Sequence, residues 1–255
     1  MRNQFILTPF FLDEASPRLE LLAQPDWHIN KPILPDGDKQ QRMSILHHPI
    51  AEFVANILAQ GDRPVSIAGD CCTTLGVLAG LQKARLNPVL LWLDAHGDFN
   101  TWETTPSGFL GGMPLAMLVG RGEQTMVHSV GLTPLPENKV ILSDGRNLDP
   151  KERDALAHSV VHHIADVCSV LDYPLLGNPL YIHFDTDVVN PKNAPAMSYR
   201  ASGGPTAAEL QAIFQSLAQT RQIVAVSMTT WTPQLDEDGR SEATCMDLLR
   251  SLIGQ

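Results

Sequence analysis

Cysteines, basic residues and long apolar segments are all scarce in this sequence of 255 residues. Its four cysteines include an adjacent pair, Cys71 and Cys72, which is a poor basis for a disulfide framework in a chain of this size. The apolar stretch Phe5–Leu7 is interrupted by Thr8 and Pro9, so we expect no signal peptide. No apolar run approaches the length that spans a bilayer. We therefore expect a cytoplasmic protein with reduced thiols and no membrane partner.

Positive charge is outnumbered by negative charge. The chain has 18 Lys and Arg residues against 28 Asp and Glu residues, which gives a formal net charge of -10. An acidic surface repels phosphate backbones, so nucleic acid is not expected as a partner. A cationic small molecule suits this balance, although many enzymes are equally acidic. Hydrophobic residues make up 44% of the chain, which is enough for a sizeable core.

Short apolar runs, each closed by polar or glycine residues, are predicted to be strands. Several are nearly continuous rather than alternating, which is typical of strands buried on both faces. The runs are Phe5–Leu7, Val65–Ala68, Val89–Leu93, Met126–Val130, Val140–Leu142, Val160–Ile164, Leu180–Phe184 and Ile223–Val226. Helical patterns lie between or after them, in Ile50–Gln60, Thr74–Arg85 and Ser241–Ile253.

Two further helix starts carry clear signals. Asp149 before Pro150 indicates an N-cap followed by proline at the first helical position, and Thr206 with Glu209 forms a capping box. The order of strand and helix predicts right-handed crossovers and a parallel sheet, hence an α/β fold. Without repeats, low-complexity stretches or Ser/Gly-rich linkers, one domain is expected over residues 1–255. The polar, proline-punctuated stretch 14–43 is expected to be an irregular surface excursion.

Unusual polar residues follow three of the predicted strands. They form the segments Gly69-Asp70-Cys71, Asp94-Ala95-His96-Gly97-Asp98 and Asp185-Thr186-Asp187. Functional residues of open parallel sheets gather at the carboxyl ends of strands. Alternate residues of an extended segment point the same way, so Asp94, His96 and Asp98 are expected to face one spot, and Asp185 and Asp187 repeat that spacing.

These carboxylates indicate a metal site. Carboxylates that converge in a cleft repel one another unless cations lie among them. Carboxylates with imidazole suit Mn²⁺ or a similar divalent ion, and a shared carboxylate can bridge two ions. Either Asp-x-Asp motif alone is more often a turn or a helix cap. The two motifs together favour the metal site.

In order and spacing, the three segments resemble those of the arginase, agmatinase and formiminoglutamase superfamily, the ureohydrolases. Residues 94–101 are similar to the family's Asp-Ala-His-x-Asp-x-Asn segment, residues 185–195 to its Asp-x-Asp-x-x-Asp-Pro-x-x-Ala-Pro segment, and Cys71 stands where the family has the histidine of Gly-Asp-His. The likeness extends from about Val65 to Pro233. It implies a three-layer α/β/α fold with a central, mainly parallel eight-stranded sheet, and a homo-oligomer.

The resemblance also implies a centre of two divalent metal ions, expected to be Mn²⁺. The implied ligands are Asp94 and Asp185 as bridges, Cys71 and Asp98 for one ion, and His96 and Asp187 for the other. In the family, a hydroxide activated by the two ions attacks a guanidinium or amidine carbon. Asp98 would accept a hydrogen bond from that hydroxide and orient it, which makes Asp98 a catalytic residue.

Several positions depart from the family pattern. Cys71 is a softer ligand than histidine, so it favours another metal or weakens Mn²⁺ binding, unless it is simply a small buried side chain. Gly111 stands in place of the proton-shuttle histidine, Thr230 in place of the carboxylate that pairs with the substrate guanidinium, and Asn190 in place of the motif's third Asp. Glu103 is expected either to supply negative charge beside the substrate, as a catalytic residue, or to be a solvated loop acid.

Positions after the metal loop favour an amino-acid substrate. In arginases, the residues that match Asn100, Thr105 and Ser107 hold the substrate α-carboxylate, and the residue that matches Asp149 receives the α-amino group. Amide and hydroxyl groups suit a carboxylate, and a lone acid suits an ammonium. Turn chemistry and a helix N-cap account for the same residues equally well.

We therefore expect a binuclear-metal hydrolase that cleaves a C–N bond at the guanidino or amidino carbon of an arginine-like small molecule. Cys71 and Gly111 together resemble a branch that includes Nω-hydroxy-L-arginine hydrolases. Gly111 and Thr230 favour instead a catalytically idle binding or regulatory protein, and a metal-dependent deacetylase shares the overall fold. His128 and His183 are further candidates, although a lone histidine near a strand is more often structural.

Overall fold

The computed structural model describes residues 1–174, 179–229 and 231–255, built around an eight-stranded sheet in the order β4-β1-β5-β10-β9-β6-β7-β8. The pairings between these strands are parallel. Its strands are β1 (Asn3–Thr8), β4 (His28–Ile29), β5 (Arg63–Ala68), β6 (Val89–Asp94), β7 (Val140–Asp144), β8 (His162–Ile164), β9 (Leu180–Asp185) and β10 (Ile223–Thr229). A small antiparallel pair joins β2 (Phe10–Phe11) to β3 (Glu14–Ala15).

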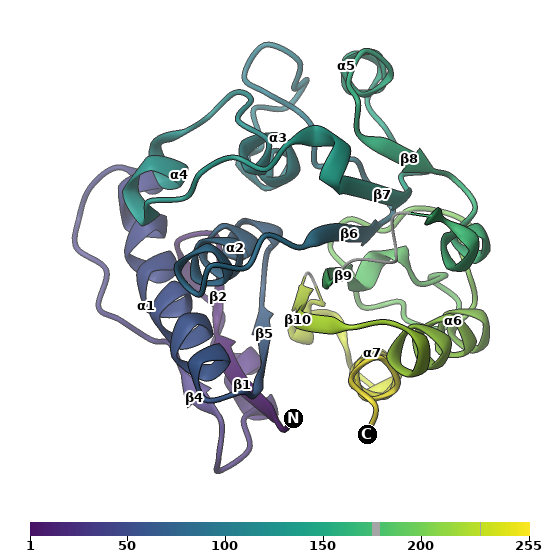
Figure 1. The fold of residues 1–255 in the computed structure, drawn as a ribbon, viewed down its shortest axis with the longest axis horizontal. Helices are drawn as coiled ribbons and strands as arrows, with labels where there is room; N and C mark the ends of the chain where they lie inside the picture. Colours follow the sequence, from purple (N-terminus) through teal and green to yellow (C-terminus); the bar gives the residue numbers. More distant parts are fainter. Residues whose placement is uncertain (175–178, 230) are drawn as a thin grey trace.

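Helices cover both faces of this sheet, which confirms the predicted three-layer α/β/α arrangement (Figure 1). One apolar core unites residues of α1 (Lys39–Ala59), α2 (Thr74–Lys83), α3 (Pro114–Leu118) and α4 (Thr125–Val130) with one face of the sheet. The other core unites residues of α6 (Ala207–Thr220) and α7 (Arg240–Ile253) with the opposite face. Helix α5 (Pro150–Ala157) follows β7. All six residues of β5, β6 and β9 are buried, as the continuous apolar runs predicted.

The predicted strand over Met126–Val130 is wrong, because this segment is helix α4. Met126, Val127 and Val130 are buried while His128 and Ser129 are exposed, which is the one-sided burial of a helix. The helix ends on Gly131, whose left-handed φ of 71° suits a C-cap glycine. The eighth strand of the sheet is instead the short edge strand β4.

The stretch 14–43 is more ordered than the sequence analysis expected. It contains β3 and β4 and the first turn of α1, and Leu19 and Asn30 are buried within it. Helix α1 begins before the predicted Ile50, because the Asp38 side chain accepts hydrogen bonds from two first-turn backbone amides. Pro49 lies inside the helix, although a proline usually marks a helix start or end.

The predicted helix starts at Asp149 and Thr206 are confirmed. The Asp149 and Thr206 N-caps both form capping boxes, with Glu152 and Glu209 at the third helical position. The helices predicted over Thr74–Arg85 and Ser241–Ile253 correspond to α2 and α7. The parallel order places the carboxyl ends of β5, β10, β9 and β6 side by side at one edge of the sheet.

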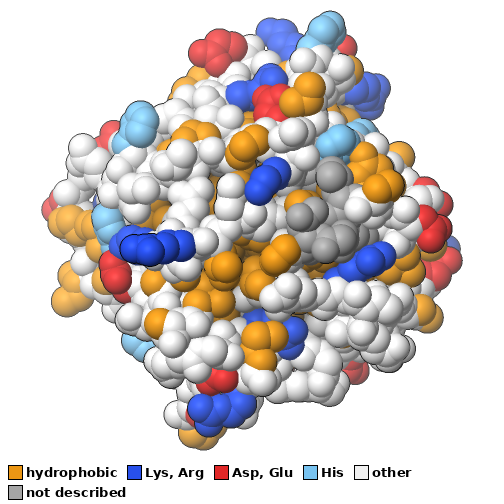
Figure 2. All heavy atoms as spheres, viewed as in Figure 1, with side chains coloured by type: hydrophobic (Ala, Val, Ile, Leu, Met, Phe, Trp, Pro, Cys, Tyr) orange, Lys and Arg blue, Asp and Glu red, His pale blue; other side chains and the backbone are white. Residues whose placement is uncertain are grey.

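On the face of the outer surface drawn in Figure 2, Lys and Arg side chains are scattered rather than gathered into one basic patch. Within the described ranges, every helix is too short or too polar to pass through a bilayer.

Helix α1 contains a buried histidine that makes stability depend on pH. His47 is fully buried, and neither ring nitrogen has a hydrogen-bond partner among the described residues. Burial, together with the neighbouring His48, lowers the pKa of His47 to about 3. The unfolded chain therefore binds a proton at this residue below a pH of about 6.5, while the folded chain stays neutral until about pH 3. The folded state loses stability as the pH falls through that window.

We predict that His47→Leu makes the protein less sensitive to acid. Going from pH 7.5 to pH 5, the free energy of unfolding of the variant should fall by about 2 kcal/mol less than that of the unmodified chain, since the linked proton uptake is removed. Urea unfolding at the two pH values measures this difference. The exposed His158 provides a control, because His158→Leu should leave the pH effect unchanged. An identical pH effect in His47→Leu would contradict the prediction.

Candidate metal centre

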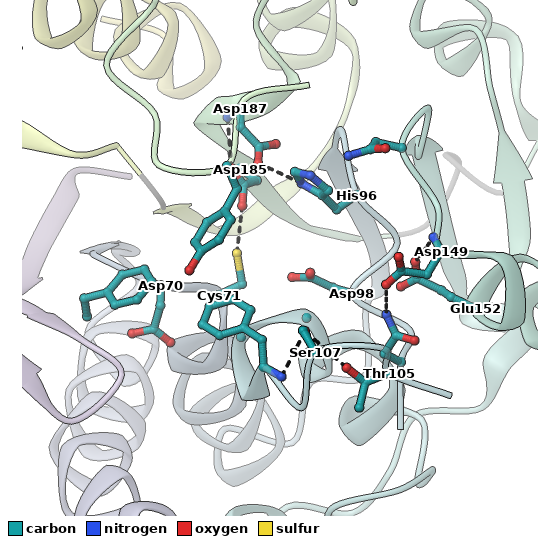
Figure 3. Close-up of a pocket in the computed structure, with 17 residues that line it drawn as sticks. Asp70, Cys71, His96, Asp98, Thr105, Ser107, Asp149, Glu152, Asp185 and Asp187 are labelled. Atoms are coloured by element: carbon teal, nitrogen blue, oxygen red, sulfur yellow. Dashed lines mark hydrogen bonds and ion pairs between the residues drawn. The ribbon is translucent and has the colours of Figure 1, made fainter. Parts of the chain in front are cut away.

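Polar side chains at the tips of four neighbouring strands converge on one cavity. Cys71 follows β5, Asp94 ends β6, Asp185 ends β9, and Thr229 ends β10. Asp94, Asp185 and Cys71 are almost fully buried. Figure 3 shows Cys71, His96, Asp98, Asp185 and Asp187 turned toward one another in this cavity. The structure thus brings the predicted metal-ligating residues together.

Two groups of potential ligand atoms share one carboxylate. In the first group, atoms of Cys71, Asp94, His183 and Asp185 lie within 4.8 Å of one another. In the second, atoms of Asp94, His96 and Asp187 meet the same limit. Asp94 belongs to both groups, which is the arrangement of a carboxylate between two ions.

The first group is held by short contacts. The Cys71 thiol donates to Asp185 Oδ2 at 2.8 Å, and its Sγ lies 3.0 Å from Thr229 Oγ1. Burial raises the pKa of the Cys71 thiol well above its usual value, and the charges of Asp185, Asp98 and Asp94 raise it further. In the absence of a cation this thiol keeps its proton.

The second group is an ion pair. His96 Nδ1 lies 2.9 Å from Asp187 Oδ2 and 3.6 Å from Asp94 Oδ1. Burial lowers the pKa of His96, but hydrogen bonds and charge from Asp187 and Asp94 outweigh that effect and raise it to about 12. The proton on His96 supplies positive charge where a metal ion would otherwise supply it.

Asp98 has the most unusual surroundings. Its backbone adopts a left-handed φ of 49°, which is uncommon outside glycine. Asp98 is only 6% exposed, and its Oδ2 atom has no hydrogen-bond partner among the described residues. Burial raises the pKa of Asp98 well above its usual value, and the charges of Asp94 and Asp185 raise it further. A buried carboxylate oxygen without a donor calls for a cation or a proton.

The donor set therefore fits divalent cations. Cys71, His96 and the carboxylates of Asp98, Asp185 and Asp187 line the cavity, and Asp94 lies close behind them. Burial of so many acids is costly without positive charge. The backbone is arranged to hold the carboxylates, since Asp94 accepts from the His96 amide at 2.6 Å and Asp185 from the Asp187 amide at 2.9 Å. These bonds fix the loops that carry the ligands.

The predicted substrate-binding residues lie on the outer wall of the same cavity. Asn100, Thr105, Ser107 and Asp149 all line it. The Asn100 amide donates to Asp149 Oδ2 at 3.0 Å, and Thr105 and Ser107 accept from the backbone amides of a tight turn. The two hydroxyl oxygens also lie 3.5 Å from each other, which leaves at least one hydroxyl proton for donation to a ligand.

Two other predicted residues stand apart from this wall. Glu103 is exposed, accepts from Thr101 Oγ1 at 2.6 Å and is not among the residues that line the cavity. Its position gives no support to the expected catalytic role, and agrees with the alternative of a solvated loop acid. Thr230 lies outside the described residues.

Sequence reasoning missed Glu152. This residue is 3% exposed and lines the cavity, and its carboxylate accepts from the amides of Phe99 at 2.8 Å and Asp149 at 3.1 Å. Burial raises the pKa of Glu152 to about 7. Gly97 permits this approach, because a Cβ there would lie 2.6 Å from Glu152 Oε1. The available signal was the acid three residues after the Asp149 N-cap.

Three aromatic side chains, here called the aromatic wall, close another side of the cavity: Phe11, Phe109 and Tyr199. The ring centroids of Phe109 and Tyr199 are 5.0 Å apart, and those of Phe11 and Phe109 are 6.2 Å apart. A Cβ at Gly111 would lie 2.5 Å from two ring carbons of Phe109. The Phe109 ring therefore occupies the space that a side chain at position 111 needs.

Comparison with known proteins agrees with this geometry. The family model of the arginase family matches residues 14–254. The arginase of Bacillus subtilis (strain 168) is 31% identical over 219 residues, which cover 81% of this chain and 74% of that protein. The N(omega)-hydroxy-L-arginine amidinohydrolase of Streptomyces lavendulae is 27% identical over 252 residues, which cover 97% of this chain and 85% of that protein.

Solved structures share the fold. The crystal structure of the Bacillus cereus arginase aligns with a TM-score of 0.85 at 24% identity, over 100% of this chain and 99% of the other. The family match over nearly the whole chain, the identity with the Bacillus subtilis protein and the carboxylate-lined cavity at the strand tips lead to one conclusion. This chain belongs to the arginase family.

Proposed function

We propose that this protein is a binuclear-metal hydrolase that cleaves a C–N bond at the guanidino carbon of an arginine-like substrate, with Nω-hydroxy-L-arginine preferred over arginine. The observation that carries the proposal is the membership of Asp94 in both groups of potential metal ligands. Membership of the arginase family supports the reaction class. The coverage of 97% of this chain by a hydroxyarginine amidinohydrolase supports the substrate class.

The ligands assigned to the two ions are those that the resemblance to the ureohydrolases implies, and the two groups of ligand atoms support them for all but Asp98, which belongs to neither group. Asp94 and Asp185 would lie between the ions, with Cys71 and Asp98 toward one ion and His96 and Asp187 toward the other. When bound, two divalent cations, with Mn²⁺ typical of the family, supply Lewis acidity that makes water a nucleophile near neutral pH. Loss of the His96 proton would accompany entry of a cation, because a metal ligand must present a free lone pair.

Proton transfer is assigned to Asp98. Its Oδ2 is buried, lines the cavity and has no competing hydrogen-bond partner among the described residues. Once cations balance its charge, this carboxylate is placed to take a proton from the attacking water and to return it to the departing nitrogen. Asp98 thereby does part of the work that a shuttle histidine at position 111 would do.

Substrate orientation is assigned to the outer wall. Asn100, Thr105 and Ser107 present an amide and two hydroxyl groups, which are uncharged donors for an α-carboxylate. Asp149 presents a carboxylate for the α-amino group, and its bond from Asn100 ties the two halves of this subsite together. The substrate side chain would then extend inward toward Asp94 and Asp98.

The aromatic wall favours a less basic reacting group. Gly111 and Phe109 present an apolar surface where a basic side chain is expected from the family pattern, and Thr230 offers no carboxylate to a guanidinium cation. A hydroxyguanidine is less basic than a guanidine, so it loses less when no carboxylate faces it. This difference supports hydroxyarginine as the preferred substrate.

Two other functions compete with this proposal. A catalytically idle binding protein would retain the fold and lose activity, and Gly111 and Thr230 are the substitutions that favour it. A metal-dependent deacetylase shares the overall fold, but two ligand groups that share Asp94 favour a two-ion centre over a one-ion site. A cytoplasmic location, expected from the cysteine pattern, and a homo-oligomer, implied by the resemblance, both stay predictions.

Replacement of Asp94 tests the shared ligand. We expect Asp94→Asn to reduce bound metal from two ions per chain to less than one, and to lower hydrolysis by about 1,000-fold or more, since Lewis-acid stabilisation worth several kcal/mol is lost. Elemental analysis of the metal-supplemented protein and a product assay measure the two effects. The exposed Asp154 gives the control, and Asp154→Asn should change neither. Unchanged metal content in Asp94→Asn would refute the assigned centre.

Substrate preference is tested by product release. We expect kcat/KM for Nω-hydroxy-L-arginine to exceed that for L-arginine by about tenfold or more, equivalent to about 1.4 kcal/mol of transition-state stabilisation. Hydroxyurea and urea release report the two reactions. Equal or reversed rates would contradict the substrate assignment, and absence of both products from protein that holds two ions would favour the idle binding protein.

Restoration of a histidine at position 111 tests the role of the Phe109 ring. Gly111→His alone should lower the midpoint of thermal unfolding, because its Cβ would contact Phe109 at 2.5 Å. The double variant Phe109→Ala with Gly111→His should recover stability relative to Gly111→His and should raise arginine hydrolysis relative to Phe109→Ala. A stable Gly111→His protein with an unchanged Phe109 would show that the ring moves aside freely.

A further inference from the structure

A fully buried histidine, His183, lies beside Cys71 in the proposed metal centre. His183 is on β9, two residues before Asp185, so both side chains project from the same face of the strand. The sequence left His183 as a further candidate, with a structural role as the more common alternative. Its position beside Cys71, Asp94 and Asp185 gives it another role.

One ring nitrogen of His183 is already held by the protein. Nδ1 lies 2.9 Å from Ser227 Oγ, and that hydroxyl lies 2.8 Å from the Tyr181 hydroxyl. This hydroxyl chain belongs to neighbouring strands β9 and β10 and fixes the ring orientation. Histidines that bind metals are commonly held through their second nitrogen in this way.

The other ring nitrogen faces the site. Nε2 lies 3.5 Å from Thr229 Oγ1, a long contact, and Thr229 Oγ1 lies 3.0 Å from Cys71 Sγ. The ring also packs against Trp92, with centroids 3.9 Å apart, and Trp92 donates to Asp94 Oδ2 at 2.9 Å. The imidazole therefore lies beside both Asp94 and Cys71, and Nε2 has only the long contact to Thr229 among the described residues.

We propose that His183 is a metal ligand, and that it restores to the Cys71 side the imidazole that the family places at position 71. This proposal rests on the binuclear centre proposed above. The first group then offers one thiolate, one imidazole and the carboxylates of Asp94 and Asp185, all within 4.8 Å of one another. As an ion enters, Cys71 Sγ loses the proton now directed at Asp185, and that proton leaves to solvent.

With Cys71 and His183 as ligands, the first group should select a different metal ion from the second group. Thiolate with imidazole suits Zn²⁺ and Co²⁺, whereas carboxylate-rich surroundings suit Mn²⁺. The second side, with Asp94, His96 and Asp187, keeps the harder set. The protein should therefore hold two different ions when both are supplied, with Zn²⁺ on the Cys71 and His183 side.

The first experiment measures metal content in the full chain. After chelation and reloading with equimolar Zn²⁺ and Mn²⁺, we expect about one Zn²⁺ and one Mn²⁺ per chain. His183→Asn should weaken Zn²⁺ binding by about 100-fold, the upper end of the loss seen when even an outer partner of a ligand is removed. His47→Asn is the matched control, since His47 is equally buried but belongs to neither ligand group, and it should leave Zn²⁺ binding unchanged.

The second experiment uses the unmodified sequence, so it holds even where His183→Asn fails to fold. In Co²⁺-loaded protein with ¹⁵N-labelled histidine, NMR should show hyperfine-shifted signals from two imidazoles, His96 and His183, and absorption should show a thiolate-to-cobalt band. One shifted imidazole in protein that binds two ions overturns the role of His183 and leaves the proposed hydrolase intact. Absence of any bound ion overturns both.

Discussion

Mutual repulsion among buried carboxylates is the constraint on which this structure depends. The parallel sheet carries Asp94 and Asp185 to adjacent strand tips and brings Asp98 and Asp187 to the same cavity. In water such a cluster would be spread apart or protonated, but here the surrounding cores fix it. Burial raises the pKa of Asp98 and of Cys71, and the charges of neighbouring carboxylates raise both further, while Asp187 and Asp94 raise the pKa of His96. Positive charge, supplied by protons or by metal ions, must balance the repulsion among these carboxylates.

Much of this architecture could be predicted from local patterns. Continuous apolar runs located β5, β6 and β9, because strands covered by helices on both faces have no polar side. The position of Asp94, His96 and Asp98 at a strand end located the cavity, although the chain is not extended beyond Asp94: it bends at Ala95 and His96, and Asp98 has a left-handed φ of 49°. The resemblance to the ureohydrolases supplied the number of strands and the pairing of the motifs.

What could not be predicted depends on contacts between distant segments. A buried segment of five residues, Met126–Val130, has no period long enough to separate strand from helix, so tertiary packing decides. His183 carries no motif, and its proximity to Cys71 arises only when β9 and β5 are placed on either side of β10. Gly111 read alone indicated a lost function, whereas the structure shows Phe109 in the vacated space.

The aromatic wall is assembled from three segments that are far apart in the chain, the two-residue strand β2 at Phe11 and the loops at Phe109 and Tyr199, whereas the ligand cluster is anchored to the strand tips. Loops tolerate exchange far better than buried strands do. In the proposed function, bond cleavage therefore depends on the strand tips, while the choice of substrate depends in part on the more exchangeable aromatic wall. Substitution of a single ring in the aromatic wall can then change the preferred substrate while the carboxylate cluster stays intact.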